Sequence, residues 1–442
     1  MKDLLRKLGC VILMALLVFF TVSCINDTYE GSGNNEELGN NEELGNSEEP
    51  GNNEEPGNSG EPGNSEEPGN SEEPDDLPVG IFFTVTNTNE WNNALSTIKS
   101  GGNGPLNGQK YYTITVNSDI MVIGSTDYSF GTIYNITVTI NGNGKLYIIG
   151  QGYLLNIEVG QTLIIDSEDL ILEGLKKGQN DSTLDNNKAL IYTYGGTLEL
   201  HNGTIRGNNN AGSDGGGVYA LAGSFTMTGG TISDNISYRG GGVFASNFIM
   251  TGGTITGNSS PNGNGVYAGS FTMSGGSINN NNSRSELSYV NSQGGGVYVA
   301  SSGSMSGGYI TDNSSGISPF NNSNDFSGLG GGIYVAAGSF TMTGGTISDN
   351  IARGGGRFAA GGSIHYNIAG RLLAGGGGVF VSDRASFTKT GGGVIEDNTA
   401  NYGSNVCWGT NVNSALGTLA KYRTNSLGVN DDFSTNLLSG WD

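Results

Sequence analysis

One fifteen-residue stretch of this chain, AGSFTMTGGTISDNI, occurs twice without change, at 222–236 and at 337–351. It belongs to a series of related units, each built around a triplet similar to Gly-Thr-Ile. The isoleucines of these triplets are Ile205, Ile232, Ile255, Ile278, Ile310, Ile347 and Ile395. They are separated by 27, 23, 23, 32, 37 and 48 residues. The shortest spacing, 23 residues, occurs twice, and the other spacings exceed it by different amounts. This pattern indicates a solenoid whose coils share one circumference and in which some coils carry insertions.

Each unit holds three short segments of strand character, separated by Gly, Ser and Thr. In the first regular unit these are GGGVYA at 215–220, SFTM at 224–227 and GTIS at 230–233. None has helical periodicity, and the long apolar segment that a leucine-rich repeat would need is absent. Three short strands per coil of about 23 residues predict an all-β parallel β-helix solenoid.

Strand alternation predicts which side chains point into this solenoid. Equivalent inward positions of successive coils should stack into one continuous core. In the first regular coil the residues expected inside are Val218, Ala220, Phe225, Met227 and Ile232. Those expected to face water are Thr226, Thr231 and Ser233.

Asparagine stands three positions after the repeat isoleucine in all seven units: Asn208, Asn235, Asn258, Asn281, Asn313, Asn350 and Asn398. The position before it holds Gly, Asp or Asn, residue types that tolerate left-handed backbone. We therefore expect a structural asparagine ladder at a tight corner, with amides hydrogen-bonded from coil to coil. The alternative is a row of carboxylates and amides that binds cations.

An aromatic residue occupies the outward middle position of the first strand in six units: Tyr219, Phe244, Tyr267, Tyr298, Tyr334 and Phe380. At the spacing of neighbouring strands, about 4.8 Å, these rings would form an outward-facing aromatic ladder. Such a ladder is a candidate binding surface for sugar rings or a protein partner. The alternative is that the rings only stabilise the sheet by stacking on one another. The insertions 282–293, 314–329 and 351–375 all enter after the asparagine, so we expect them along one edge as a second candidate binding face.

The first 23 residues resemble a bacterial lipoprotein signal peptide. A basic start precedes an apolar run from Val11 to Phe20, about half the length of a membrane-spanning helix. The following Thr21-Val22-Ser23-Cys24 resembles a lipobox, although Thr21 stands where Leu is usual. The resemblance implies lipid attachment at Cys24 and a membrane anchor, and Ile25 after the cysteine implies the outer membrane. An ordinary signal peptide with a chance cysteine is the alternative.

Residues 24–78 are expected to form a disordered acidic linker. Seven hexapeptides such as GNSEEP run from Gly33 to Pro74, and residues 33–78 carry −15 of the chain's net charge of −22. With almost no apolar surface to bury, this segment should act as an extended tether. Calcium binding by its Glu pairs is an alternative that lacks a preorganised cage. The remaining charge is not basic, which argues against nucleic acid as a partner.

The rest of the chain divides into 79–200, an N-terminal cap with irregular coils, 201–405, the regular repeats, and 406–442, a C-terminal cap or tail. Within 89–98, one helical face carries Trp91, Ala94, Leu95 and Ile98. We expect a short amphipathic helix here that caps the open end of the solenoid. Cys407 would be the one cysteine left outside the processed N-terminus, so no internal disulfide is expected.

The repeated GGGVYV and FTMTGGTISDN units, with the lipobox, resemble bacterial surface lipoproteins of the right-handed, pectate-lyase-like β-helix superfamily and adhesin-type or polymorphic outer-membrane repeats. The resemblance covers about residues 80–405. It implies a right-handed β-helix displayed at the cell surface, but that superfamily hosts enzymes as well as adhesins.

Enzymes on this fold place acidic residues on outward positions of adjacent coils. Here those positions are mostly Thr and Ser, interrupted by Glu199, Arg206 and Glu396. The two histidines, His201 and His365, are far apart in sequence. The best remaining acids are Asp166, Glu168, Asp169 and Glu173, which look like a solvated turn. The sequence thus predicts no catalytic residues, metal site or cofactor.

The expected function is that of a lipid-anchored, surface-exposed outer-membrane protein with an adhesin-like role. Its predicted partners are the membrane, through the N-terminal lipid, and a glycan or a host or matrix protein. A polysaccharide lyase or glycoside hydrolase is the first alternative, and a passive surface-coat protein is the second.

Overall fold

The structure is a computed structural model. It describes residues 80–101, 108–180, 182–283, 292–316, 328–353, 378–382 and 384–400, and the backbone of 406–409, 419–423 and 433–434. The predicted signal peptide, Cys24 and the linker lie outside these residues, as do 284–291, 317–327 and 354–377 of the insertions. Within the described part of the chain, no helix has the length and apolar character needed to cross a membrane.

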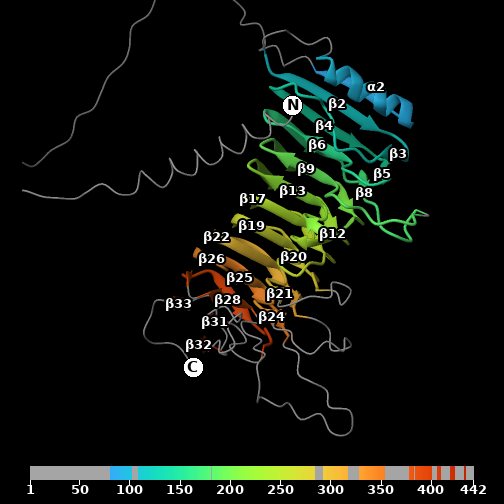
Figure 1. The fold of residues 1–442 in the computed structure, drawn as a ribbon. Helices are drawn as coiled ribbons and strands as arrows, with labels where there is room; N and C mark the ends of the chain where they lie inside the picture. Colours follow the sequence, from blue (N-terminus) through green and yellow to red (C-terminus); the bar gives the residue numbers. More distant parts are fainter. Residues whose placement is uncertain are drawn as a thin grey trace, which may run out of the picture. The chain divides into compact units, whose positions relative to one another are not determined.

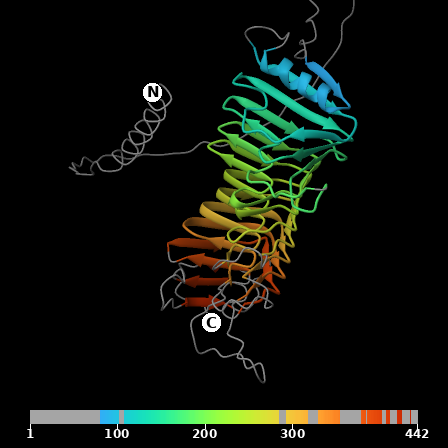
Figure 2. The same ribbon diagram turned by 45° about the vertical axis from the view of Figure 1, so that its right-hand side comes forward.

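The described chain folds into a parallel β-helix, as the repeat predicts (Figure 1). Successive coils pair strand to strand in parallel, and equivalent core positions of the regular coils stay in register, although β22 carries local register shifts against both of its neighbours. Val243 pairs with Val266, Phe248 with Phe271 and Ile255 with Ile278. The 27 strands of the large sheet wrap around three faces, because four long strands bend from one face to the next. Figure 2 shows the stacked coils from a second side.

We name the three faces by the order of the segments in a regular unit. Face 1 contains β6 (Leu155–Ile157), β9 (Ile191–Tyr194), β13 (Val218–Leu221), β25 (Ile333–Val335), β28 (Val379–Ser382) and β31 (Val406–Gly409). Face 2 contains β1 (Ile81–Val85), β2 (Lys110–Val116), β4 (Ile136–Gly142), β7 (Gln161–Ile165), β10 (Thr197–Leu200), β14 (Ser224–Met227) and β29 (Ala385–Lys389). Face 3 contains β3 (Ile120–Ile123), β5 (Lys145–Ile149), β8 (Ile171–Glu173), β11 (Thr204–Arg206), β15 (Thr231–Ser233), β18 (Thr254–Thr256), β20 (Ser277–Asn279) and β30 (Gly393–Glu396).

The long strands connect these faces. They are β17 (Val243–Met250) and β19 (Val266–Met273) from face 1 to face 2, β22 (Val297–Thr311) across all three, and β26 (Gly338–Ser348) from face 2 to face 3. Short parallel pairs follow the corner after face 3: β12 (Asn209–Asp214) with β16 (Ile236–Arg239), β21 (Ser292–Gln293) with β24 (Gly328–Leu329), and β23 (Ser314–Ser315) with β27 (Ile351–Ala352). Near the C-terminal end, β32 (Leu419–Arg423) and β33 (Phe433–Ser434) pair antiparallel with β31 and β29.

The core is a set of stacked rows running along the solenoid. All five residues predicted to point inward in the first regular coil are fully buried. One row continues through Phe225, Phe248 and Phe271, whose rings lie 5.0 and 6.1 Å apart. Each buried apolar side chain of this size contributes about 1.5–3 kcal/mol. The row that contains Met227 continues to the buried Lys389, which pairs in register with Met342.

The predicted capping helix is present as α2 (Thr88–Lys99), and it packs against β1 and β3 (Figure 1). Asn87 caps its first turn, because the Asn87 side chain accepts hydrogen bonds from the backbone N–H groups of Asn89 and Glu90. Trp91, Ala94 and Ile98 are buried and close the end of the core.

One of the residues expected to face water is buried. Thr226 and Thr231 are half-buried, but Ser233 is 9% exposed. Ser233 lies in register between Arg206 and Thr256 on face 3. Because both neighbours have longer side chains, the serine lies below them although it points away from the core.

Candidate binding surface

The seven asparagines form one buried row at the corner after face 3. The backbone N–H of each of the first six donates to the Oδ1 of the next, over 3.0–3.1 Å. From Asn235 onward, each Nδ2 also donates to the carbonyl of the isoleucine one coil earlier, such as Ile205 for Asn235 (3.2 Å). The preceding Asp234, Asn280, Asp312, Asp349 and Asp397 have positive φ, from 52° to 57°.

These contacts explain the ladder as a structural element. All seven side chains are 6% exposed or less, and their amides bond to one another and to backbone. The glycines before face 1 leave room for the ladder: a Cβ on Gly217 would lie 3.0 Å from Asn235 Nδ2. Asn186 extends the row by one rung, since its Nδ2 donates to Asn208 Oδ1 over 2.9 Å. A cation would have to displace hydrogen bonds that hold the coils together.

The aromatic residues of face 1 also form a continuous row. Neighbouring ring centroids from Tyr219 to Phe380 lie 4.5–5.3 Å apart, and every pair is stacked. The row is longer than the sequence indicated, because Tyr192 stacks on Tyr219 at 5.1 Å, and the Tyr153 ring, tilted by 33°, lies 4.7 Å from that of Tyr192. Tyr192 could have been found in the sequence, since Ile191-Tyr192-Thr193 repeats the alternation of the GGGVYA segment.

The outward orientation predicted for this row does not make all of it accessible. Tyr153, Tyr192, Tyr219 and Tyr267 are half-buried, with one edge open to solvent, whereas Phe244 is 8% exposed. Tyr334 and Phe380 are 1% and 0% exposed. Both pack with Leu329 of β24 in a small separate cluster, with Tyr298 against its margin. We call Tyr153 to Tyr267 the open part of the row and Tyr334 with Phe380 the covered part.

Arg239 lies over the middle of the open part. Its guanidinium is 5.1 Å from the Phe244 ring centroid and 5.2 Å from that of Tyr267. Asp214 holds the guanidinium through hydrogen bonds of 2.9 and 2.6 Å. Both residues belong to the short β12–β16 pair, so this corner sheet places a cation on the aromatic row. This contact accounts for the low exposure of Phe244.

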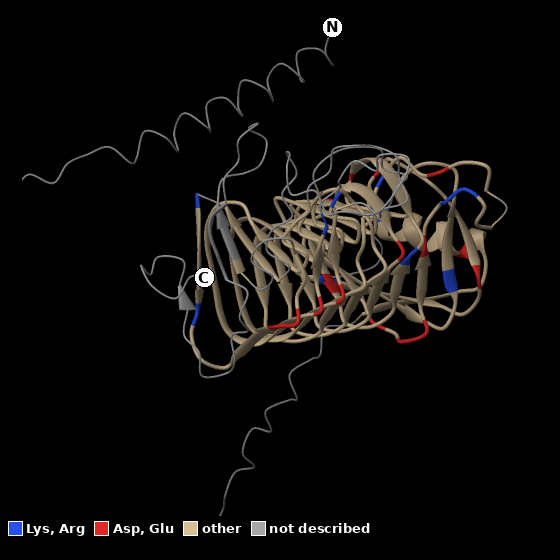
Figure 3. Ribbon diagram, turned by 90° about the horizontal axis from the view of Figure 1, so that it is seen from below, with Lys and Arg blue, Asp and Glu red and all other residues tan. Residues whose placement is uncertain are grey.

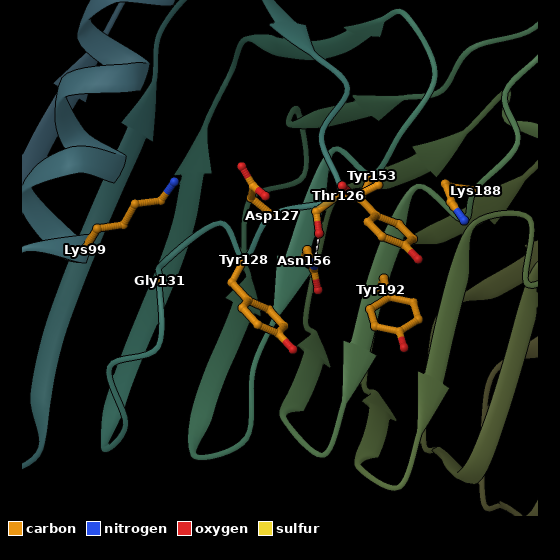
Figure 4. A pocket seen from close by; sticks show the side chains of 9 residues that line it. All are labelled: Lys99, Thr126, Asp127, Tyr128, Gly131, Tyr153, Asn156, Lys188 and Tyr192. Atoms are coloured by element: carbon orange, nitrogen blue, oxygen red, sulfur yellow. Dashed lines mark hydrogen bonds between the residues drawn. The ribbon is translucent and has the colours of Figure 1, made fainter. Parts of the chain in front are cut away.

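The N-terminal end of the open part borders a cavity of about 600 Å³. It forms there because face 1 begins only at β6, whereas face 2 continues to β1 at the end of the solenoid. In place of an earlier face 1 strand, the irregular segment 124–131 lies over β6, and Ser129 N–H donates to the Asn156 carbonyl over 2.8 Å. The side chains that line the cavity are Lys99, Thr126, Asp127, Tyr128, Tyr153, Asn156, Lys188 and Tyr192 (Figure 4).

The tyrosines of this region remain uncharged well above neutral pH. Burial, and then the neighbouring Tyr192 and Tyr219, raise the pKa of Tyr153 to about 12. Burial also raises the pKa values of Tyr192 and Tyr219. For Tyr128 the main cause of a raised pKa is its hydrogen bond with Glu158. The surface therefore presents neutral rings and hydroxyl groups, with lysines and one aspartate around them.

Charged residues are sparse along the coils (Figure 3), and most of the acids named from the sequence are separated. Glu173 is buried, and Arg206, Lys145 and Asn180 bond to it at 2.8, 3.3 and 2.7 Å. Asp166 joins a different group: His201 lies 3.0 Å from Glu199 and 3.9 Å from Asp166. The sequence did not reveal this group, because Asp166 is far from the other two residues in the chain. They meet because β7 and β10 are neighbouring strands of face 2. Glu168, Asp169 and Glu396 belong to neither group.

No cluster suited to a metal ion occurs among the residues that the structure describes. The insertion edge predicted as a second binding face lies largely outside those residues, with Leu329 as its described contact to the aromatic row. Comparisons with models of protein families, with curated proteins and with solved structures found no match.

Proposed function

We propose that this chain is a lipid-anchored, adhesin-like protein of the bacterial cell surface that binds an extended glycan along the open part of its aromatic row. The lipobox-like TVSC with Cys24 supports the anchor, and the acidic hexapeptides support a tether between anchor and solenoid. On this proposal the solenoid belongs to the right-handed, pectate-lyase-like superfamily that its repeats resemble.

The observation that carries the proposal is the continuous row of rings from Tyr153 to Tyr267 beside the cavity, in which the four tyrosines are half-buried and Phe244 alone is covered. Because the central rings cover one another's faces, a ligand meets ring edges, which contact apolar C–H groups of sugars, and tyrosine hydroxyls, which bond to sugar hydroxyls. A row of rings at strand spacing offers the same contact repeatedly, which suits a ligand that is itself a repeating chain. The rigid solenoid fixes the rings before binding, so little conformational entropy is lost.

A glycan array probed with the full-length protein tests this function. We expect binding to extended glycans, and at least a tenfold loss of affinity for Tyr192→Ala and Tyr219→Ala. The control is Tyr309→Ala, because Tyr309 is a 59% exposed tyrosine of face 3 outside the row. Retention of binding by both row variants, or absence of any glycan binding, would count against the proposal.

The group of Asp166, Glu199 and His201 favours a second candidate, a polysaccharide-cleaving enzyme. A histidine between two carboxylates can transfer protons, and glycoside hydrolysis requires a pair of carboxyl groups. Incubation with polysaccharides should then release reducing or unsaturated ends, and Glu199→Gln should abolish the release. An inactive wild-type protein would remove this candidate and leave the binding function.

A further inference from the structure

The cavity at the N-terminal end of the aromatic row contains an unpaired buried hydrogen-bond acceptor. Asn156 is 3% exposed, and its Oδ1 has no hydrogen-bond partner among the described residues. The rest of the residue is fixed: its Nδ2 donates to the Thr126 carbonyl over 2.9 Å and its backbone N–H to Ser129 Oγ over 2.8 Å. The first bond orients the side-chain amide and the second holds the backbone, so the unpaired oxygen has a fixed position beside the cavity.

Tyrosine rings lie on both sides of this acceptor. In the view of Figure 4, the Asn156 side chain lies between those of Tyr128 and Tyr192, and the Tyr153 ring lies 4.7 Å from that of Tyr192. A ligand group that reaches Asn156 therefore lies among the tyrosine rings that line the cavity. The oxygen is covered by its neighbours in the free protein, so a ligand donor reaches it through a small movement of the wall.

Lys188 supplies a donor at the other side of the same rings. Its ammonium lies 5.9 Å from the Tyr153 ring centroid, and it makes no ion pair with any described residue. The asparagine ladder holds its backbone, since Asn208 Nδ2 donates to the Lys188 carbonyl over 2.8 Å. Lys99 at the end of α2 and Asp127 add a further donor and an acceptor for hydroxyl groups.

A secondary amide with a methyl group matches this arrangement. Its N–H would donate to Asn156 Oδ1, its carbonyl would accept from Lys188, and its methyl group would pack on a tyrosine ring. A plain sugar hydroxyl could bond to Asn156, but it would leave the apolar surface beside it unfilled. We propose that the cavity is a subsite for a 2-acetamido sugar at the end of a glycan chain, an inference that rests on the binding function proposed above.

Calorimetry on the full-length protein with two trisaccharides of the same linkage tests this proposal. Tri-N-acetylchitotriose carries acetamido groups, and cellotriose carries hydroxyl groups at the same positions. We expect the wild-type protein to bind the acetamido trisaccharide at least tenfold more tightly. Lys188→Met should reduce that preference about five- to tenfold, since one hydrogen bond to a charged donor is lost, and leave cellotriose binding within about twofold.

The matched control is Lys177→Met, because Lys177 is exposed on the same connection and does not line the cavity. Asn156→Asp keeps an oxygen at the acceptor position but loses the donor to Thr126. We expect that variant to keep part of the preference, and circular dichroism will establish that it is folded. Equal binding of both trisaccharides by the wild-type protein would overturn the acetamido subsite and leave the binding function intact. Binding of neither would overturn the acetamido subsite, and the glycan array would then decide the binding function separately.

Discussion

The open and covered parts of the aromatic row differ in what lies over them. Ring spacing is nearly the same, 5.1 Å between Tyr192 and Tyr219 and 5.3 Å between Tyr334 and Phe380. The covered part carries Leu329 from the corner strand β24, and the open part ends beside a cavity. Stacking is thus a property of the repeat, whereas accessibility depends on the segments between repeats. The same sequence position stabilises the solenoid in one place and is available for a ligand in another.

The largest expected difference is between two tyrosines of the same row. Tyr334→Ala empties a fully buried site and should lower the free energy of unfolding by about 3–5 kcal/mol. Tyr219→Ala removes stacking at a half-buried site and should cost about 1–2 kcal/mol. Urea denaturation of the full-length variants measures both values.

The two variants should show the opposite order in ligand binding. Tyr219→Ala should lose glycan affinity, whereas Tyr334→Ala, at a temperature where it is folded, should keep it. Equal stability losses, or a binding defect only in the Tyr334 variant, would remove the distinction between the two parts.

The asparagine ladder runs beside both parts, so its rungs should be equivalent. Asn235→Ala and Asn350→Ala each leave buried N–H and carbonyl groups unpaired and should cost about 2–4 kcal/mol, alike within about 1 kcal/mol. The control is Asn282→Ala, an exposed asparagine beside a rung, which should change stability by about 0.5 kcal/mol or less. Thermal unfolding provides the comparison, and a negligible cost at either rung would contradict the ladder's structural role.

Protonation of Glu173 at low pH should lower the free energy of unfolding. Its burial raises the pKa, but hydrogen bonds from Asn180 and Arg206 and the charge of Lys145 outweigh burial, and the net pKa lies below its usual range. A carboxyl pKa that is lower in the folded state than in the unfolded state stabilises the fold at pH values above the unfolded-state pKa. This stabilisation is lost as the pH falls through the folded-state pKa. Glu173→Gln should cost about 1–3 kcal/mol at pH 7.

The melting temperature, measured from pH 7 to pH 3, should therefore fall less steeply for Glu173→Gln than for the wild-type protein. Parallel pH profiles for the two proteins would show that another carboxyl group governs the acid response.

The smallest expected effect concerns the phenols at alkaline pH. Burial raises the pKa of Tyr153 and of Tyr298 to about 12. The protonated phenol is favoured in the folded state, so this stability is complete below the ordinary pKa of about 10 and is lost as pH rises toward and above 12. Tyr298→Phe should leave the melting temperature at pH 7 nearly unchanged and flatten its decline between pH 10 and pH 12. If the decline of the melting temperature between pH 10 and pH 12 is unchanged in this variant, other groups cause the loss of stability.

The repeat determined the fold. A constant shortest step, three strand-like segments and a recurring asparagine predicted the coil and its inward residues, and the apolar face of 89–98 predicted the capping helix, since each depends on local periodicity. The aromatic positions were equally evident. Their number was underestimated only because Tyr153 lies outside a regular strand and Tyr192 in an irregular coil.

The candidate site required the tertiary structure. The cavity brings together residues 27–36 positions apart, such as Lys99 and Tyr128, Asn156 and Lys188, or Tyr153 and Lys188. They meet because face 1 begins later along the chain than the other two faces. No local pattern in the sequence encodes where a face begins. The low exposure of Tyr334, Phe380 and Phe244 was likewise decided by Leu329 and Arg239, which approach from segments between repeats. Local sequence determines which side of a strand a residue occupies, but only packing determines what covers it.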